Sequence, residues 1–332
     1  MKLSLRILGL PNVGEPTLYK SHTKKSVPAE NYPFCTIDPS VGIVPVPDER
    51  LWKLSELSKS AKTIPAVIEF VDIAGLVKGA SEGEGLGNKF LSNIREVDAI
   101  LEMVRIFEDK DILHVHNEVN PISDIEVINY ELILADTETI TKRISNLSRE
   151  VKQAKKEAVF ENSVLEKVLE TLKAGKLANS LELLPEENDV LKSMHLLTAK
   201  PILYALNTSE ASVNKLEVQD KIPGPYVIVD PVFEKGFDDL IKKSYETLNL
   251  MTYFTTGEDE TRAWTIEKGW TAPLAGTAIH NDFKDKFIRA EVVHTDDLLS
   301  SGSFASAKEK GKVRTEGKEY IVKDGDVIEF KI

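Results

Sequence analysis

The fold of this chain is decided by a stretch near its start, Gly9-Leu10-Pro11-Asn12-Val13-Gly14-Glu15-Pro16-Thr17. Apolar residues alternate through residues 3–7 just before it, which predicts a strand, and a helix-like run follows it. Gly9 and Gly14 have the glycine spacing of a P-loop, a turn whose backbone N–H groups hold phosphates. Two P-loop positions differ: Glu15 stands in place of the lysine, and Pro16 in place of the magnesium-binding hydroxyl.

The composition is that of a globular protein of 332 residues, with room for two or three domains. The hydrophobic fraction is 42% and the charged fraction 29%, and no run approaches the length of a membrane span. The first residues lack the basic and apolar regions of a signal peptide. The single cysteine, Cys35, excludes an internal disulfide and a cysteine-rich zinc site. We therefore expect a cytoplasmic protein with no membrane partner.

The net charge of −12 argues against broad, non-specific binding to nucleic acid, which requires a basic face. We expect no DNA partner. Local basic patches and contacts with basic proteins remain open.

The first part of the chain, up to about residue 119, alternates predicted strands and helices. Residues 66–71 and 99–104 form β-rich runs, and residues 88–95 between them have helical spacing. This alternation favours a parallel sheet covered on both faces. Strand character returns at residues 201–207 and 225–229, which predicts that the same sheet is resumed later in the chain.

Residues 124–195 separate these two parts, and their apolar residues recur at helical spacing. We expect a largely helical insertion, such as an antiparallel hairpin. Four basic residues in it are spaced to share one face of a helix: Arg149, Lys152, Lys155 and Lys156. This face is either solvated or a contact surface for RNA or a partner protein.

The last part of the chain, about residues 251–332, is predicted to be a small β-rich domain that follows a helix at residues 237–248. Strands are expected at residues 262–266, 320–322 and 327–330, the last two joined by a hairpin turn at Asp324-Gly325-Asp326. His280 and His294 are isolated in the sequence, so we expect structural or surface histidines there rather than metal ligands.

Three further motifs follow the P-loop-like stretch in the order of a nucleotide site. Asp72 ends the strand at residues 66–71, where a carboxylate holds magnesium through water, and Gly75 can offer its amide to a terminal phosphate. Thr36 lies between the two phosphate motifs, where a switch threonine would reach magnesium. Asn207 ends a later strand and could read the edge of a base.

These motifs closely resemble those of the YchF (Obg-like ATPase) subfamily of P-loop GTPases. The resemblance covers nearly the whole chain, and it is carried by residues 9–14, 31–39, 70–81, 83–88, 124–129, 253–255, 262–266 and 320–327. It implies an α/β P-loop NTPase G domain with a helical, coiled-coil-like insertion, and a C-terminal β-grasp, ubiquitin-like TGS domain. The implied limits are 1–123 and 197–248 for the G domain, 124–196 for the arm and 249–332 for the TGS domain.

The resemblance also implies a function. Members of the subfamily are ribosome-associated NTPases, so the implied partner is the ribosome, both protein and rRNA, and the implied cofactor is magnesium with ATP or GTP. A preference for ATP is implied because Asn207-Thr208-Ser209-Glu210 lacks the lysine and aspartate of the usual guanine-reading motif. Leu76 matches the hydrophobic residue that replaces a water-positioning glutamine, and His114 matches the proposed catalytic histidine.

The site residues implied by position fall into three groups. The catalytic candidate is His114, and the metal ligands are Thr36 and Asp72. The nucleotide-binding residues are Asn12, Val13, Gly14, Glu15, Pro16, Thr17, Gly75, Asn207, Thr208 and Glu210.

The departures at Glu15 and Pro16 leave two functions open. Glu15 reverses the charge that the family's lysine supplies to the phosphates, and Pro16 removes an N–H and a hydroxyl. The helix itself tolerates both, because proline and carboxylates suit a first helical turn. One alternative is a YchF-type ATPase or GTPase with impaired binding and hydrolysis. The other is a nucleotide-free pseudo-NTPase that binds the ribosome or a protein.

Overall fold

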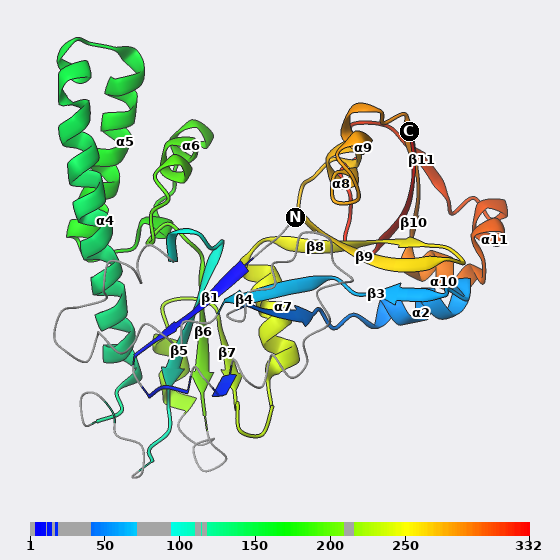
Figure 1. The fold of residues 1–332 in the computed structure, drawn as a ribbon, viewed down its shortest axis with the longest axis horizontal. Coiled ribbons are helices and arrows are strands. Elements are labelled where there is room, and N and C mark those ends of the chain that lie inside the picture. The colour runs from blue at the N-terminus through cyan, green and yellow to red at the C-terminus, as the bar shows by residue number, and fades with distance from the viewer. Residues whose placement is uncertain are drawn as a thin grey trace. The chain divides into compact units, whose positions relative to one another are not determined.

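The computed structural model describes residues 4–10, 12–14, 17–18, 41–71, 94–109, 114, 118–208 and 216–332. They fall into two compact units, whose elements are labelled in Figure 1. The parallel-sheet unit draws its described residues from 4–21 and 71–236, and the mixed-sheet unit from 22–70 and 237–332. None of the described helices has both the length and the hydropathy needed to cross a membrane.

The parallel-sheet unit is built on four neighbouring strands in the order β1 (Ser4–Gly9), β5 (Ala99–Arg105), β6 (Ile202–Asn207) and β7 (Tyr226–Val229). All three pairings are parallel, which confirms the predicted sheet. Every residue of β5 and β6 is buried, because helices and loops cover both faces of such a sheet. The strands are in register at their carboxyl ends, where Gly9 lies opposite Met103 and Arg105 lies opposite Asn207.

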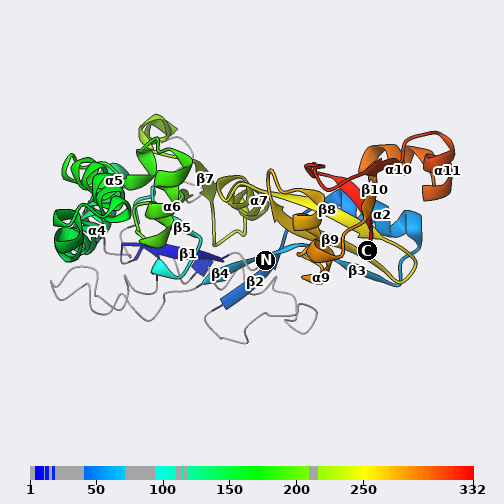
Figure 2. The ribbon, with the colours of Figure 1, turned by 90° about the horizontal axis from the view of Figure 1, so that it is seen from above.

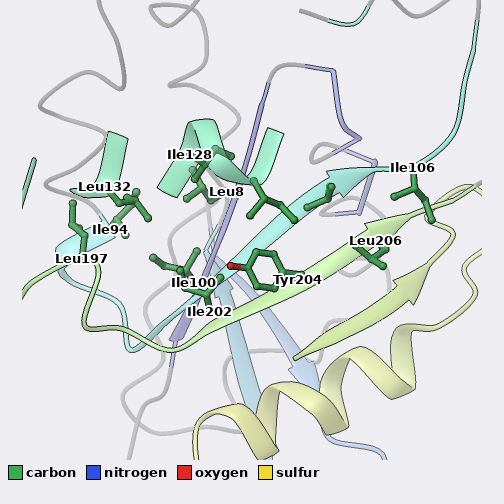
Figure 3. Close-up of a cluster of buried hydrophobic side chains, with 12 residues drawn as sticks. Leu8, Ile94, Ile100, Ile106, Ile128, Leu132, Leu197, Ile202, Tyr204 and Leu206 are labelled. Atoms are coloured by element: carbon green, nitrogen blue, oxygen red, sulfur yellow. The ribbon is translucent and has the colours of Figure 1, made fainter. Parts of the chain in front are cut away.

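One face of this sheet carries the core shown in Figure 3. Leu8, Ile100, Val104 and Leu206 from the strands pack there with Ile125, Ile128 and Leu132 from the first turns of a helix, and Tyr204 lies among them. Burial of such side chains contributes about 1.5–3 kcal/mol each, before the entropy of ordering them is counted. The same helix therefore packs against the sheet with its first turns and continues into the helical insertion.

That helix is α4 (Pro121–Lys152), and it forms a hairpin with α5 (Lys156–Lys173), as Figures 1 and 2 show. Asn120 caps it by accepting a hydrogen bond from the Ser123 amide at 3.2 Å, and Pro121 occupies the first turn. The hairpin confirms the predicted helical insertion. It is followed by the 3₁₀ turn η3 (Ala178–Ser180) and by α6 (Pro185–Ser193), which share a second apolar core with it.

The prediction that four basic residues share one helix face is wrong. α4 ends at Lys152, Ala154 has a φ of 54°, and Lys155 is the residue before α5 begins. Arg149, Lys152, Lys155 and Lys156 therefore surround the turn at the tip of the hairpin, all of them exposed. A left-handed residue breaks a helix that apolar periodicity alone would continue.

The buried carboxylate of Asp136, on α4, anchors the arm where the chain returns to the sheet. It accepts hydrogen bonds from the backbone amides of Leu197 at 3.1 Å and Thr198 at 2.7 Å, and from the Thr198 hydroxyl at 2.7 Å. Arg95 lies 3.4 Å away. Burial raises the pKa of Asp136, and these hydrogen bonds and the charge of Arg95 oppose that rise.

The mixed-sheet unit contains a sheet in the order β11 (Arg314–Glu316), β10 (Arg289–His294), β12 (Asp326–Lys331), β8 (Leu250–Thr256), β9 (Glu260–Glu267) and β3 (Lys62–Ile64). Its helices are α2 (Glu49–Ser58), α7 (Phe237–Thr247), α8 (Ala272–Gly276), α9 (Asp282–Asp285), α10 (Thr295–Ser301) and α11 (Phe304–Glu309). Strands β2 (Val41–Pro45) and β4 (Val67–Val71) are hydrogen bonded neighbours. The 3₁₀ turn η5 (Leu216–Lys221) precedes β7 in the parallel-sheet unit.

The predicted hairpin around residue 325 is wrong, although β12 itself confirms the strand expected at 327–330. Residues 320–322 form no strand, and β12 pairs with β10 and β8 instead. The carboxylate of Asp326 accepts hydrogen bonds from the Lys323 amide at 2.9 Å and the Tyr320 hydroxyl at 2.7 Å. These bonds stabilise a local turn, because an aspartate can satisfy backbone groups that a strand partner would otherwise take.

Candidate nucleotide site

The loop after β1 leaves the carboxyl edge of the parallel sheet and opens a helix. Asn12 and Gly14 have left-handed backbones, with φ of 67° and 100°. The Gly14 carbonyl accepts hydrogen bonds from the amides of Thr17 at 3.1 Å and Leu18 at 3.0 Å. Leu18 is buried, which fixes the start of the helix against the unit. The predicted strand–loop–helix arrangement is confirmed at these residues.

Asn207 at the end of β6 closes the other side of this loop. Its side-chain amide donates to the Val13 carbonyl at 2.6 Å, and the residue is 5% exposed. A Cβ on Gly14 would come within 2.4 Å of the same amide nitrogen and 3.5 Å of the Met103 methyl. Gly14 is thus required twice, by its positive φ and by the close approach of Asn207.

The structure therefore brings together four of the residues expected at the nucleotide site: Asn12, Val13, Gly14 and Asn207. Thr208 extends the same edge through a backbone hydrogen bond from its amide to the Val229 carbonyl at 2.9 Å. Thr17 is exposed on the first helical turn. The remaining expected residues lie outside the described part of the chain: Glu15, Pro16, Thr36, Asp72, Gly75, Leu76 and Glu210.

The described residues of this loop fit the phosphates of a magnesium nucleotide. A loop with left-handed residues at Asn12 and Gly14, followed by a helix N-terminus, is a backbone cradle suited to phosphate. The loop lacks the positive charge and the magnesium ligand that such a nucleotide needs, because position 15 carries a carboxylate and Pro16 has neither a hydroxyl nor an N–H. Among the described residues no group of three or more His, Cys, Asp or Glu side chains could hold a metal ion.

His114, the catalytic candidate, is buried and hydrogen bonded to an aspartate. Its Nε2 lies 3.0 Å from Oδ2 of Asp124, in the first turn of α4, and both side chains are less than 5% exposed. The sequence reasoning did not single out Asp124. A signal for Asp124 was present in the sequence, because it is a charged residue among the apolar positions at the start of a long helix.

Glu102 on β5 is a second buried acid that sequence reasoning passed over. It has no exposed surface, and burial raises its pKa well above the ordinary value, with the charge of Asp124 adding to the effect. The signal was present, since Glu102 is the one charged residue within the apolar run 99–104. His280 and His294, by contrast, are partly exposed and face nearby aspartates, as expected of surface histidines.

Comparison with known proteins gives consistent results along the whole chain. A family model described as "50S ribosome-binding GTPase" matches residues 4–130, and the C-terminal YchF GTPase model, described as "Protein of unknown function", matches residues 250–332. The ribosome-binding ATPase YchF of Bacillus subtilis is 50% identical, over 100% of this chain and 99% of the relative. The corresponding protein of Escherichia coli O157:H7 is 44% identical, over 98% and 97%.

A solved structure gives the same result for the fold. The YchF GTPase of Schizosaccharomyces pombe matches with a TM-score of 0.88 at 36% sequence identity, covering 99% of this chain and 98% of that one. The agreement includes both the parallel sheet with its helical arm and the C-terminal region.

Proposed function

This chain belongs to the YchF family of P-loop NTPases, and from that membership we propose that it is a cytoplasmic ribosome-binding protein with weakened ATP binding and hydrolysis. The ribosome-binding part is supported by relatives that match from end to end and carry that activity in their names. The weakening is carried by one observation, the pair Glu15 and Pro16 in an otherwise recognisable phosphate loop.

The charge at position 15 is the larger of the two effects. Two unit charges about 4 Å apart repel by roughly 4 kcal/mol at an effective dielectric constant of about 20. Glu15 would meet the phosphates of a nucleotide with this repulsion where the family's lysine attracts them. Pro16 adds the loss of one phosphate-binding N–H and of the hydroxyl that would ligate magnesium.

We assign the nucleotide roles by position on this scaffold. Asn12, Val13, Gly14 and Thr17 would hold phosphate, with Gly75 at the terminal phosphate, and Asn207, Thr208 and Glu210 would face the base. Thr36 and Asp72 would hold magnesium, and His114 would act on the attacking water. The geometry of Val13, Gly14 and Asn207 supports the first of these groups, because it joins the loop to the end of β6.

The same pair of residues supports a second candidate function. A loop that has exchanged its lysine for a carboxylate can fill its own phosphate cradle with that carboxylate, since a helix N-terminus attracts any anion. The chain would then be a nucleotide-free pseudo-NTPase that keeps its arm and C-terminal domain for binding the ribosome or a protein.

Calorimetric titration with ATP and magnesium separates the two functions. We expect weak ATP binding by the wild-type chain, and binding at least tenfold tighter by the double variant Glu15→Lys, Pro16→Ser, because the repulsion is replaced by attraction. Glu186→Lys, Pro185→Ser, the same exchange at exposed residues outside the loop, is the matched control and should not tighten binding. Micromolar wild-type affinity that the double variant does not improve would contradict the proposed weakening.

A further inference from the structure

Three ionisable side chains from different parts of the parallel-sheet unit are buried, and two of them, His114 and Asp124, are in contact. Glu102 comes from β5, Asp124 from the first turn of α4, and His114 from the connection between them. As whole residues, these three are 0%, 3% and 7% exposed. Ionisable groups are this deeply buried only when they pair with one another or lose their charge.

Asp124 and His114 form the paired part of this group. A carboxylate can only accept a hydrogen bond, so the 3.0 Å contact requires a proton on Nε2 of the imidazole. When the ring is neutral, this contact selects the Nε2–H tautomer. An aspartate hydrogen bonded to one imidazole nitrogen is the arrangement of a base with its orienting group.

Glu102 is the uncharged part. Neither of its carboxyl oxygens has a hydrogen-bond partner within the described part of the chain. Burial raises the pKa of Glu102 well above its ordinary value, and the charge of Asp124 raises it further. Tyr204 on β6 lies opposite Glu102, and its own pKa is also raised, by burial first and by Glu102 second. Asp124, unlike Glu102, has the imidazole of His114 as a hydrogen-bond partner.

We propose that Asp124 is a positioning residue for His114, fixing the tautomer and orientation of its ring. The catalytic consequence rests on the proposed function of His114. The positioning itself does not, because it follows from the buried contact.

Nitrogen NMR of the full-length chain measures the positioning directly. Two-bond proton–nitrogen correlations distinguish the tautomers of a neutral histidine, and a His114→Gln variant assigns the signal. We expect the Nε2–H form in the wild type and its loss in Asp124→Ala. The isosteric Asp124→Asn should retain part of it, because the amide oxygen can still accept. Glu126→Gln, an exposed acid on the same helix, is the control and should leave the signal unchanged.

The catalytic effect of Asp124 is measured as the rate of ATP hydrolysis with magnesium. The variants are made in a chain that also carries Glu15→Lys and Pro16→Ser. Asp124→Asn should lower kcat by roughly 10²- to 10⁴-fold at unchanged KM, the range over which a general base and its orienting carboxylate contribute. Glu126→Gln should change neither constant. If the chain that carries Glu15→Lys and Pro16→Ser does not hydrolyse ATP, the catalytic role assigned to His114 is wrong. The NMR measurement of the His114 tautomer then still tests whether Asp124 positions the ring. An Nε2–H signal that survives Asp124→Ala, or an unchanged kcat in a chain that turns over, would overturn the proposal.

Discussion

Glu102 is the residue whose chemistry differs most from what its sequence neighbourhood suggests. It occupies an interior position of a central strand, where the residues on either side of it along the strand are apolar and its side chain has no exposed surface. Removing an ionised carboxylate from water is costly, so the folded chain holds this group in its neutral form. The folded state therefore binds a proton that the unfolded state releases once the pH exceeds the ordinary value of about 4.5.

The sign of the resulting pH dependence follows from this proton. Because the pKa of Glu102 is raised in the folded state, its contribution to stability is complete below about pH 4.5 and is lost as the pH rises toward the folded pKa. Glu102→Gln lacks this loss. We expect its free energy of unfolding to gain on the wild type as pH rises, by at most about 1.4 kcal/mol per pH unit. Urea unfolding at several pH values measures the difference.

Glu126→Gln, which replaces an exposed glutamate on α4, is the control for Glu102→Gln. The difference between its free energy of unfolding and that of the wild type should not change with pH. If the Glu102→Gln and wild-type curves run parallel from acid to alkaline pH, Glu102 is ionised in the folded chain and the assignment of a neutral acid is wrong.

At the scale of elements, the long helix α4 belongs to two packing environments. Its first turns complete the core on the sheet, and its later turns pack against α5. Asp136 lies between these regions, and its carboxylate holds the amides of the returning chain at Leu197 and Thr198. The arm is therefore attached by a hydrogen-bonded anchor as well as by apolar packing.

Asp136→Ala should detach this anchor. The substitution leaves buried donors on Leu197 and Thr198 without an acceptor, which costs roughly 1–3 kcal/mol per group. We expect the free energy of unfolding to fall by about 3 kcal/mol, and the two amides to exchange with solvent faster. Asp189→Ala, at a more exposed aspartate on α6, should change stability by no more than about 0.5 kcal/mol. Equal losses in the two variants would exclude an anchor at Asp136.

At the scale of the whole molecule, the described residues 41–70 belong to the same compact unit as the C-terminal region. In the sequence these residues lie between the two expected phosphate motifs, at residues 9–17 and 72–75. β3 pairs in parallel with β9, and Arg50 on α2 bridges Asp48 and Asp324, at 2.7 Å to each. The predicted domain limits, 1–123 with 197–248, 124–196 and 249–332, remain predictions, and the compact units divide the chain at other positions.

We propose two basic clusters for ribosome contact: the arm tip, with Arg149, Lys152, Lys155 and Lys156, and a C-terminal cluster of Lys308, Lys310, Lys312, Arg314 and Lys318. The two clusters differ in how many of their charges are paired with acids. In the C-terminal cluster Lys308, Lys312 and Arg314 each pair with an acid, and Lys310 and Lys318 complete the set. At the arm tip, within the described residues, an ion pair forms only between Lys155 and Glu150, at 3.3 Å. The arm tip therefore presents more uncompensated positive charge.

Charge reversal to glutamate at Arg149, Lys152, Lys155 and Lys156 should thus weaken ribosome binding more than reversal at the five C-terminal residues. Co-sedimentation with ribosomes over a series of salt concentrations measures both. The salt dependence of binding should become shallower with each phosphate that the variant no longer neutralises. Reversal of Glu182 and Glu186, exposed acids outside both clusters, to lysine is the control for a general effect of net charge. Binding that survives reversal of both clusters would contradict the assigned contacts.

The parallel sheet, the helical arm, the P-loop-like stretch and the family can all be predicted from the amino-acid sequence. These depend on local patterns: strand runs, helical periodicity and glycine spacing, which short segments carry on their own. The same local reading misjudged the tip of the arm and the turn at residue 325, where a left-handed backbone and an aspartate side chain override the periodic signal.

The partners of the buried polar groups, by contrast, depend on how the chain folds in three dimensions. Glu102, Asp124 and His114 are distant enough in sequence that no spacing relates them, and Asn207 reaches Val13 from the far end of the arm insertion. Their burial depends on which elements pack over them, and burial sets both their charge and their partners. The loop at residues 9–17 identifies the scaffold from sequence alone, while the buried contact between His114 and Asp124 exists only in the folded unit.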